Sequence, residues 1–151
     1  MSDHPYLQQA VMLAQQNVRD GGRPFGAVLV LDDTVVATGV NRILATGDPS
    51  AHAELSAIRA ACLALGRTRL EGVRVYASGQ PCPMCLAAMH LVGIREVYFA
   101  YSNAQAEPFG LSTAGVYAQM ALPLEAQSIR ITHQSIDDEV ALYRDWQATL
   151  T

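Results

Sequence analysis

The sequence predicts an α/β fold in which helices cover the faces of a layered sheet. The expected order of elements is helix, strand, strand, helix, strand, helix, strand, which is typical of a sheet with helices packed against it. Half of the 151 residues are apolar and 16% are charged, a composition that supports one buried core. We therefore expect a single domain that spans residues 1–151.

The first half of the chain supplies a helix, a hairpin and a second helix. Apolar residues at helical spacing end at Gly21-Gly22, and the Asp32-Asp33 pair separates two short apolar runs. Ser50 can cap the second helix, which Gly66 would end. The expected elements are a helix over 3–19, strands over 27–31 and 34–40, a loop over 43–49, and a helix over 50–66.

The second half continues the alternation and then becomes less regular. Pro83 suits the first turn of a helix, and Gly93 would end that helix. Three acidic residues at 137–139 favour the start of a terminal helix, where the helix dipole stabilises negative charge. The expected elements are strands over 73–77 and 96–101, a helix over 83–91, a weak helix over 114–121, a fifth strand over 129–134, and a helix over 137–150.

Charge and hydropathy narrow the class of partner. The net charge is −4, the pI is near 5.4, and the chain has ten arginines and no lysine. A surface for nucleic acid needs clustered basic residues, so a small neutral or cationic partner fits better. No apolar run is long enough to span a bilayer, and no secretory signal begins the sequence. We expect a cytoplasmic globular protein without membrane contact.

Two of the three cysteines lie three positions apart in the segment GQPCPMC, which covers residues 79–85. Because Cys82 and Cys85 fall in the first turn of an expected helix, both sulfurs can point to one place, and the helix N-terminus stabilises thiolates. In a reducing compartment such a pair is a metal or redox site. Cys62 lies in an apolar helical pattern and is expected in the core.

The segment DPSAHAEL, residues 48–55, supplies a third ligand and a proton carrier. His52 begins its own helix, and with Cys82 and Cys85 it would leave one coordination position open, the pattern of a catalytic zinc site. Glu54 could reach that open position and transfer protons. The alternatives are a dithiol of the thioredoxin type, half of a structural zinc site, or a core cysteine pair beside an ordinary surface His-x-Glu. The thioredoxin chain order is missing, which weighs against the first.

The two segments together resemble the zinc signature of the cytidine deaminase superfamily, H-x-E followed by P-C-x-x-C. The likeness also covers RPFGAVLV at 23–30, AIRAAC at 57–62 and the region around Trp146, and it is greatest to small bacterial guanine deaminases. This resemblance implies a three-layer fold with a five-stranded mixed sheet, a homodimer, and hydrolytic removal of an exocyclic amine from a free base. It implies Zn²⁺ on His52, Cys82 and Cys85, with Glu54 as the catalytic proton carrier.

The same resemblance implies substrate contacts at Asn41, Phe25, Ala53 and Thr113, and three departures affect the choice of base. Gln80 stands where the family usually has an acidic residue, Thr113 stands where guanine deaminases have an aspartate, and the chain ends soon after Trp146. A hydroxyl accepts hydrogen bonds more weakly than a carboxylate. Guanine is the first candidate substrate, and the alternative small substrates are cytosine, a pterin or an aminotriazine. A tRNA adenosine deaminase and a non-catalytic zinc module are the alternatives of other classes.

Overall fold

The computed structural model describes residues 4–150, so the expected helix start at Asp3 lies outside the described residues. The chain divides into two compact units, residues 1–118 and 119–151. The first unit contains the sheet and the site; the second contains the end of one helix and the segments that follow it. One domain over residues 1–151 stays a prediction.

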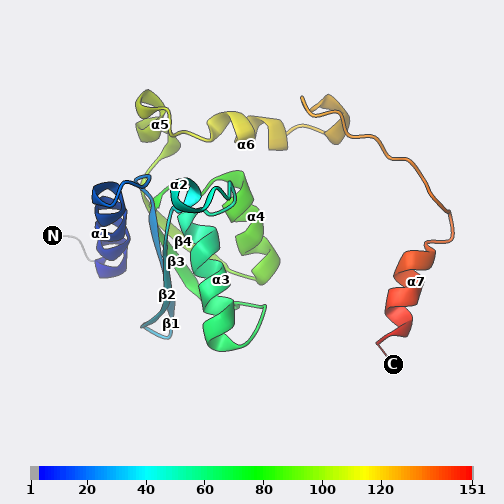
Figure 1. Cartoon of the computed structure of the whole chain (residues 1–151), viewed down its shortest axis with the longest axis horizontal. Helices are drawn as coiled ribbons and strands as arrows, with labels where there is room; N and C mark the ends of the chain where they lie inside the picture. The colour runs from blue at the N-terminus through cyan, green and yellow to red at the C-terminus, as the bar shows by residue number, and fades with distance from the viewer. Residues whose placement is uncertain (1–3, 151) are drawn as a thin grey trace. The chain divides into compact units, whose positions relative to one another are not determined.

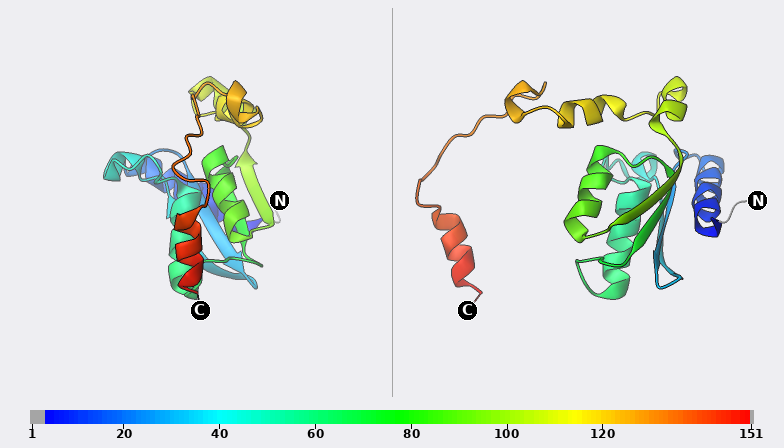
Figure 2. Two further views of the ribbon diagram at one scale, coloured as in Figure 1. Left: turned by 90° about the vertical axis from the view of Figure 1, so that its right-hand side faces the viewer. Right: turned by 180° about the vertical axis from the view of Figure 1, so that it is seen from behind.

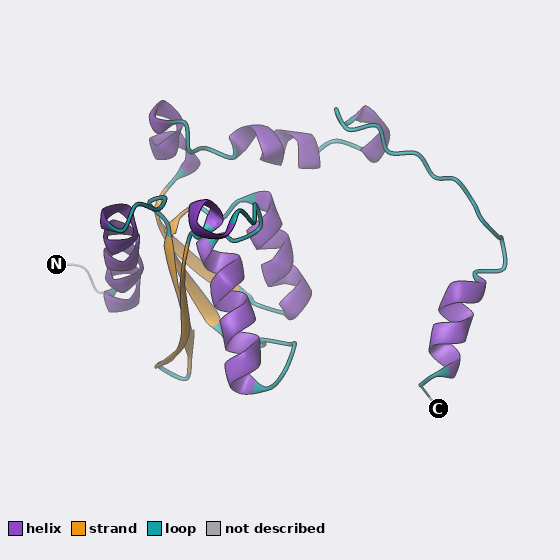
Figure 3. Cartoon of the chain, viewed as in Figure 1, coloured by secondary structure: helices purple, strands orange, loops and turns teal. Residues whose placement is uncertain are grey.

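The first unit is built on a mixed sheet of four strands (Figure 3). The strands are β1 (Gly26–Leu31), β2 (Thr34–Val40), β3 (Arg74–Gly79) and β4 (Glu96–Tyr101), in the order β2-β1-β3-β4. β1 pairs antiparallel with both β2 and β3, whereas β3 and β4 run parallel. Parallel strands need a crossover between them, and the helix that follows β3 supplies it.

Helices cover both faces of this sheet, which confirms the predicted α/β fold. The helix α1 (Pro5–Arg19) lies on one face, and α3 (Ala53–Leu65) and α4 (Pro83–Val92) lie on the other (Figures 1 and 2). β1 is apolar throughout because its two faces meet different helices: Val28 and Val30 pack toward α1, while Ala27 and Leu29 belong to the cluster with α3 and α4.

A glycine lets α3 lie directly against the sheet. A Cβ atom added at Gly39 in β2 would stand 2.3 Å from the carbonyl oxygen of Ala53 and 2.8 Å from the nitrogen of Ala57. The backbones of β2 and α3 therefore touch where α3 begins. This close approach fixes the first turn of α3 relative to the sheet, and that turn carries residues of the site.

Several expectations from the sequence need correction, and two of them concern the type of element. The described part of the chain forms four strands, because residues 129–134 have no neighbouring strand with which to share backbone hydrogen bonds; Ile129 and Ile131 are 70% and 50% exposed. The expected loop at 43–49 contains a short helix, α2 (Ile43–Thr46), which ends at Gly47 in the left-handed conformation. Asn41 starts this turn by accepting a hydrogen bond from the amide of Ile43.

The remaining elements are short. They are α5 (Asn103–Ala106), the 3-10 helix η1 (Glu107–Phe109), α6 (Ala114–Met120), the 3-10 helix η2 (Leu124–Ala126) and α7 (Ala141–Ala148). The terminal helix is shorter than predicted because the carboxylate of Asp137 accepts bonds from the amides of Glu139 and Ala141, which holds a turn before α7. Among residues 4–150, no helix has the length and apolarity needed to cross a membrane.

Candidate active site and metal centre

The segment before α3 places His52 at the start of that helix. The helix begins at Ala53, and His52 is its N-cap residue, with extended backbone angles (φ −74°, ψ 155°). Ser50 is not the cap, contrary to the prediction, because its amide and hydroxyl both donate to the carboxylate of Asp48, at 2.8 and 2.7 Å. The helix therefore begins three residues after Ser50, and the His52 ring lies outside the helical repeat.

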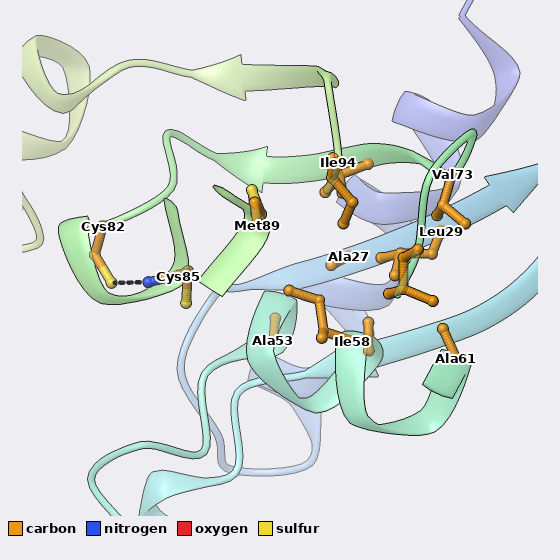
Figure 4. Packing of buried hydrophobic residues seen from close by; sticks show 13 residues of the cluster. Ala27, Leu29, Ala53, Ile58, Ala61, Val73, Cys82, Cys85, Met89 and Ile94 are labelled. Atoms are coloured by element: carbon orange, nitrogen blue, oxygen red, sulfur yellow. Dashed lines mark hydrogen bonds between the residues drawn. The ribbon is translucent and has the colours of Figure 1, made fainter. Parts of the chain in front are cut away.

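The segment after β3 places the two sulfurs in the same way. Cys82 is the N-cap residue of α4, and its sulfur accepts a hydrogen bond from the amide of Cys85 at 3.5 Å (Figure 4). Pro83 follows in the first turn, where a missing N–H costs nothing. Cys85 is fully buried and Cys82 is 8% exposed, so both thiols are held by the core that joins α3 and α4.

These three residues form one group that could hold a metal ion. Nδ1 of His52 lies 3.3 Å from the sulfur of Cys82 and 3.6 Å from that of Cys85, and the three ligand atoms all lie within 4.8 Å of one another. Bond lengths of about 2.0 Å to nitrogen and 2.3 Å to sulfur put tetrahedral ligand atoms about 3.5 Å apart, so the observed spacings fit zinc. Three ligands leave one position for water or substrate.

The electrostatics of the trio suit a cation. The pKa of the Cys82 thiol is lowered, because Cys85 and then His52 donate hydrogen bonds to its sulfur. The pKa of Cys85 is raised, because this buried thiol is the donor. The pKa of His52 is raised chiefly by its bond with Cys82, while burial and the charge of Arg23 act in the opposite direction. A cation would replace the protons that these groups otherwise share.

Glu54 lies in the first turn of α3 and is 6% exposed. Burial raises its pKa to about 7, and a hydrogen bond from the Cys85 thiol acts against that rise. A carboxyl group that titrates near neutral pH can both accept and release a proton there. Within an ideal helix, residues two apart point about 200° away from each other. His52 caps the helix and lies outside this repeat, so it lines the same pocket as Glu54.

A pocket of about 290 Å³ opens onto His52, Glu54 and Cys82. The other residues in its lining are Arg23, Phe25, Asn41, Ala53, Gln80, Gly110, Leu111, Ser112 and Thr113. All four residues expected to contact substrate therefore lie around one space with the metal group. Their roles toward a substrate remain proposals.

Each of these four side chains has a defined position. Asn41 is 5% exposed, and its amide oxygen accepts from the amide of Ile43, so its NH₂ group is the part free to donate. Phe25 packs beside the end of β3, where a Cβ at Gly79 would be 3.2 Å from its ring. Ala53 is fully buried, and the hydroxyl of Thr113 lies 3.4 Å from Oδ1 of Asn103.

Sequence reasoning missed the pocket position of Arg23 and two contacts that hold the loop after β3. The motif RPFGAVLV contains Arg23 without indicating a role for it, although Arg23 lies two residues before Phe25 and lines the same pocket. Gln80 uses its side-chain oxygen to accept from the amide of Asn103 at 2.9 Å, which ties the loop after β3 to α5. Tyr117 donates to the carbonyl of Pro81, next to the cysteines. Neither of these two tertiary contacts has a local signal in the sequence.

Comparison with known proteins agrees with the fold and this centre. The family model for the cytidine and deoxycytidylate deaminase zinc-binding region matches residues 1–101, about two thirds of the chain. The chain belongs to this family of zinc-dependent deaminases. Zinc is accordingly its cofactor, and His52, Cys82 and Cys85 form the candidate site for it.

Within the family, the similarity extends over nearly the whole chain to a guanine deaminase. The guanine deaminase of Bacillus subtilis is 34% identical over 148 residues, which cover 97% of this chain and 95% of the relative. Its X-ray structure matches with a TM-score of 0.90 over 98% of this chain and 95% of that one. A tRNA-specific adenosine deaminase of Agrobacterium fabrum is 45% identical over 94 residues, which cover 62% of each chain.

Proposed function

We propose that this protein deaminates a free nucleobase or a similar small amino-heterocycle by hydrolysis, with a guanine-like purine as the first candidate. The observation that carries the proposal is that buried Glu54 shares one pocket with His52, Cys82 and Asn41. A purely structural zinc site has no use for a carboxyl group beside its open position. The nearly full-length similarity to a guanine deaminase supports a purine over a pyrimidine.

The reaction divides between the metal and Glu54. His52, Cys82 and Cys85 would hold zinc, which when bound supplies Lewis-acid activation of water near neutral pH. Glu54 accepts a proton from the attacking water and delivers it to the ring nitrogen beside the reacting carbon. It then carries the second proton to the amine. The carbon gains a C=O bond, the C–N bond breaks, and ammonia leaves.

The other pocket residues would orient the base. Phe25 offers an aromatic face to a flat ring, and the NH₂ group of Asn41 can donate to the ring edge. Ala53 forms part of the wall beside the metal ligands. Thr113 offers a hydroxyl where a carboxylate would hold the donor groups of guanine more strongly.

We also propose a cytoplasmic homodimer. Free thiols at Cys62, Cys82 and Cys85 fit a reducing compartment. β4 is an edge strand whose Phe99 and Tyr101 are 42% and 53% exposed, an apolar edge that a second copy could cover. Light scattering of the purified protein tests this: a monomer mass at working concentration would contradict it.

The function is tested by ammonia release from protein of known zinc content. The substrates are guanine, adenine, cytosine, isoguanine, a pterin and ammeline, each followed with and without a chelator. We expect zinc-dependent release from at least one purine. Release from none of them, by protein with one zinc ion per chain, would contradict the proposal.

A tRNA adenosine deaminase is the second candidate, because the Agrobacterium enzyme has the higher identity over its shorter match. A chain with no lysine and a net charge of −4 is poorly suited to a phosphate backbone. The same assay with tRNA decides between them: conversion of adenosine in tRNA, with silence on the free bases, would favour this second function.

A further inference from the structure

The lining of the active-site pocket has an unusual balance of charge for a site that must hold guanine. Glu54 is its one carboxyl group, and the proposed reaction uses that group for proton transfer. Guanine presents N–H donors beside its carbonyl oxygen, and these need acceptors. Apart from the candidate metal ligands His52 and Cys82, the remaining polar side chains are two hydroxyls, two amides and the guanidinium of Arg23.

Arg23 has a fixed backbone and an uncommitted side chain. Its carbonyl oxygen accepts from Nδ2 of Asn17 at 2.7 Å and from the amide of Phe25 at 2.9 Å, which holds the turn between α1 and β1 at the pocket. Within residues 4–150, the ion pairs are Arg69 with Glu71 and Arg74 with Asp33, so the guanidinium of Arg23 is not neutralised by a carboxylate.

Arg23 brings a positive charge to the lining of this pocket. A guanidinium presents five donors in a planar fork that matches two oxygen atoms of an anion. Arg23 is exposed and belongs to the pocket lining, so its guanidinium is available to a heterocycle bound there.

We propose that Arg23 determines specificity by binding an oxyanion, so that the pocket prefers an amino-heterocycle that is negatively charged near neutral pH. The charge can come from an ionised ring amide or from a carboxylate substituent. This inference rests on the proposed function, since it concerns the substrate of the same pocket. The preferred substrate becomes an acidic heterocycle similar in shape to guanine instead of neutral guanine itself.

The first test measures binding without turnover. Xanthine loses a ring proton near neutral pH and hypoxanthine does not, and neither has an amine to remove. Calorimetry slightly above neutral pH should show that the zinc protein binds xanthine more tightly. Arg23→Gln should weaken xanthine binding about tenfold and change hypoxanthine binding little, since charged hydrogen bonds at a solvent-exposed rim are of that strength.

Matched variants separate a direct contact from a change in net charge. Arg42→Gln removes the same charge from an exposed arginine outside the pocket lining and should leave both affinities unchanged. Arg23→Lys should keep part of the preference. Pterin and pterin-6-carboxylate form a second pair of ligands. Tighter binding of the carboxylate that is lost in Arg23→Gln would identify a carboxylate substituent as an accepted source of the charge.

The second test uses turnover. In 8-azaguanine a ring CH of guanine is replaced by nitrogen, which makes the ring more acidic at nearly constant shape, so kcat/KM for 8-azaguanine relative to guanine should fall in Arg23→Gln. Equal binding of xanthine and hypoxanthine by the unaltered protein, or equal losses on substitution, would overturn the role of Arg23 while leaving deamination intact. Arg23-dependent xanthine binding by a protein that deaminates none of the substrates would support the role of Arg23 and contradict the proposed deamination.

Discussion

Glu54 is the residue whose surroundings decide most of the chemistry. It is buried among the metal ligands and has a pKa near 7, whereas an exposed glutamate would stay ionised. In Glu54→Gln an NH₂ group replaces one carboxyl oxygen, which keeps the shape of the side chain and removes its ability to transfer protons. This substitution should change both the activity and the pH dependence of stability.

Glu54→Gln should retain zinc and lose activity by a factor on the order of 10²–10⁴, because general acid and base catalysis is worth that much. The measurement is kcat with metal analysis of the same sample. Glu71→Gln, at an exposed surface ion pair with Arg69, is the control and should stay active. An active Glu54→Gln protein would exclude Glu54 as the proton carrier.

In the metal-free protein, Glu54 makes stability depend on pH. Its folded pKa of about 7 lies above the ordinary value of 4.5, so the folded state binds the proton more tightly and loses stability as pH rises through this window. Relative to the unaltered protein, metal-free Glu54→Gln should gain about 2–4 kcal/mol of unfolding free energy between those pH values. Urea unfolding of both proteins measures this difference, and a constant difference across the window would refute the raised pKa.

Thr113 is the residue at which the choice of base can be changed. Thr113→Asp introduces a carboxylate into the pocket and should raise kcat/KM for guanine over other bases about 10–100-fold, the strength of one charge-assisted hydrogen bond. Thr113→Asn has similar size without the charge and should give a much smaller change. An unaltered substrate profile in Thr113→Asp would mean that this side chain does not meet the base.

At the scale of elements, the starts of α3 and α4 set the geometry of the metal group. Both helices begin with a cap residue that is also a candidate ligand, His52 or Cys82, so a shift of either helix would move one of them. The contact between β2 and the first turn of α3 fixes the position of the helix start that carries His52.

Gly39→Ala should displace that turn. The added methyl group would overlap the backbone of α3, which costs about 1–3 kcal/mol or more in unfolding free energy and should also weaken zinc binding. Gly115→Ala is the matched control, because a Cβ there meets nothing within 4 Å and alanine favours the helix α6. Denaturant unfolding and zinc titration test the pair; equal stability of both variants would show that α3 can move without cost.

At the scale of the whole molecule, zinc on His52, Cys82 and Cys85 would join two helices that are separated by a strand in the sequence. Binding at a free zinc concentration about 1,000-fold above Kd would stabilise the folded state by about 4 kcal/mol. A chelator should therefore lower the Tm of the unaltered protein.

Cys82→Ala should lose zinc and show a Tm that a chelator no longer changes, because two ligands do not complete the site. Cys62→Ala removes a thiol of α3 that is outside the metal group and should keep the zinc response. Thermal unfolding with zinc analysis compares them. A zinc-loaded Cys82→Ala protein would require a different set of ligands.

The sequence by itself determined the order of the main elements, the mixed α/β class and the candidate zinc site, because these follow from local patterns: apolar periodicity, a proline at a helix start, and paired cysteines. The tertiary structure alone decided the rest. His52 is the N-cap of α3 instead of Ser50, because the amide and hydroxyl of Ser50 donate hydrogen bonds to the carboxylate of Asp48. Residues 129–134 did not form a strand, because a strand depends on a neighbour. Arg23 joined the pocket because the turn before β1 lies beside the start of α3, a proximity in space that no local pattern encodes.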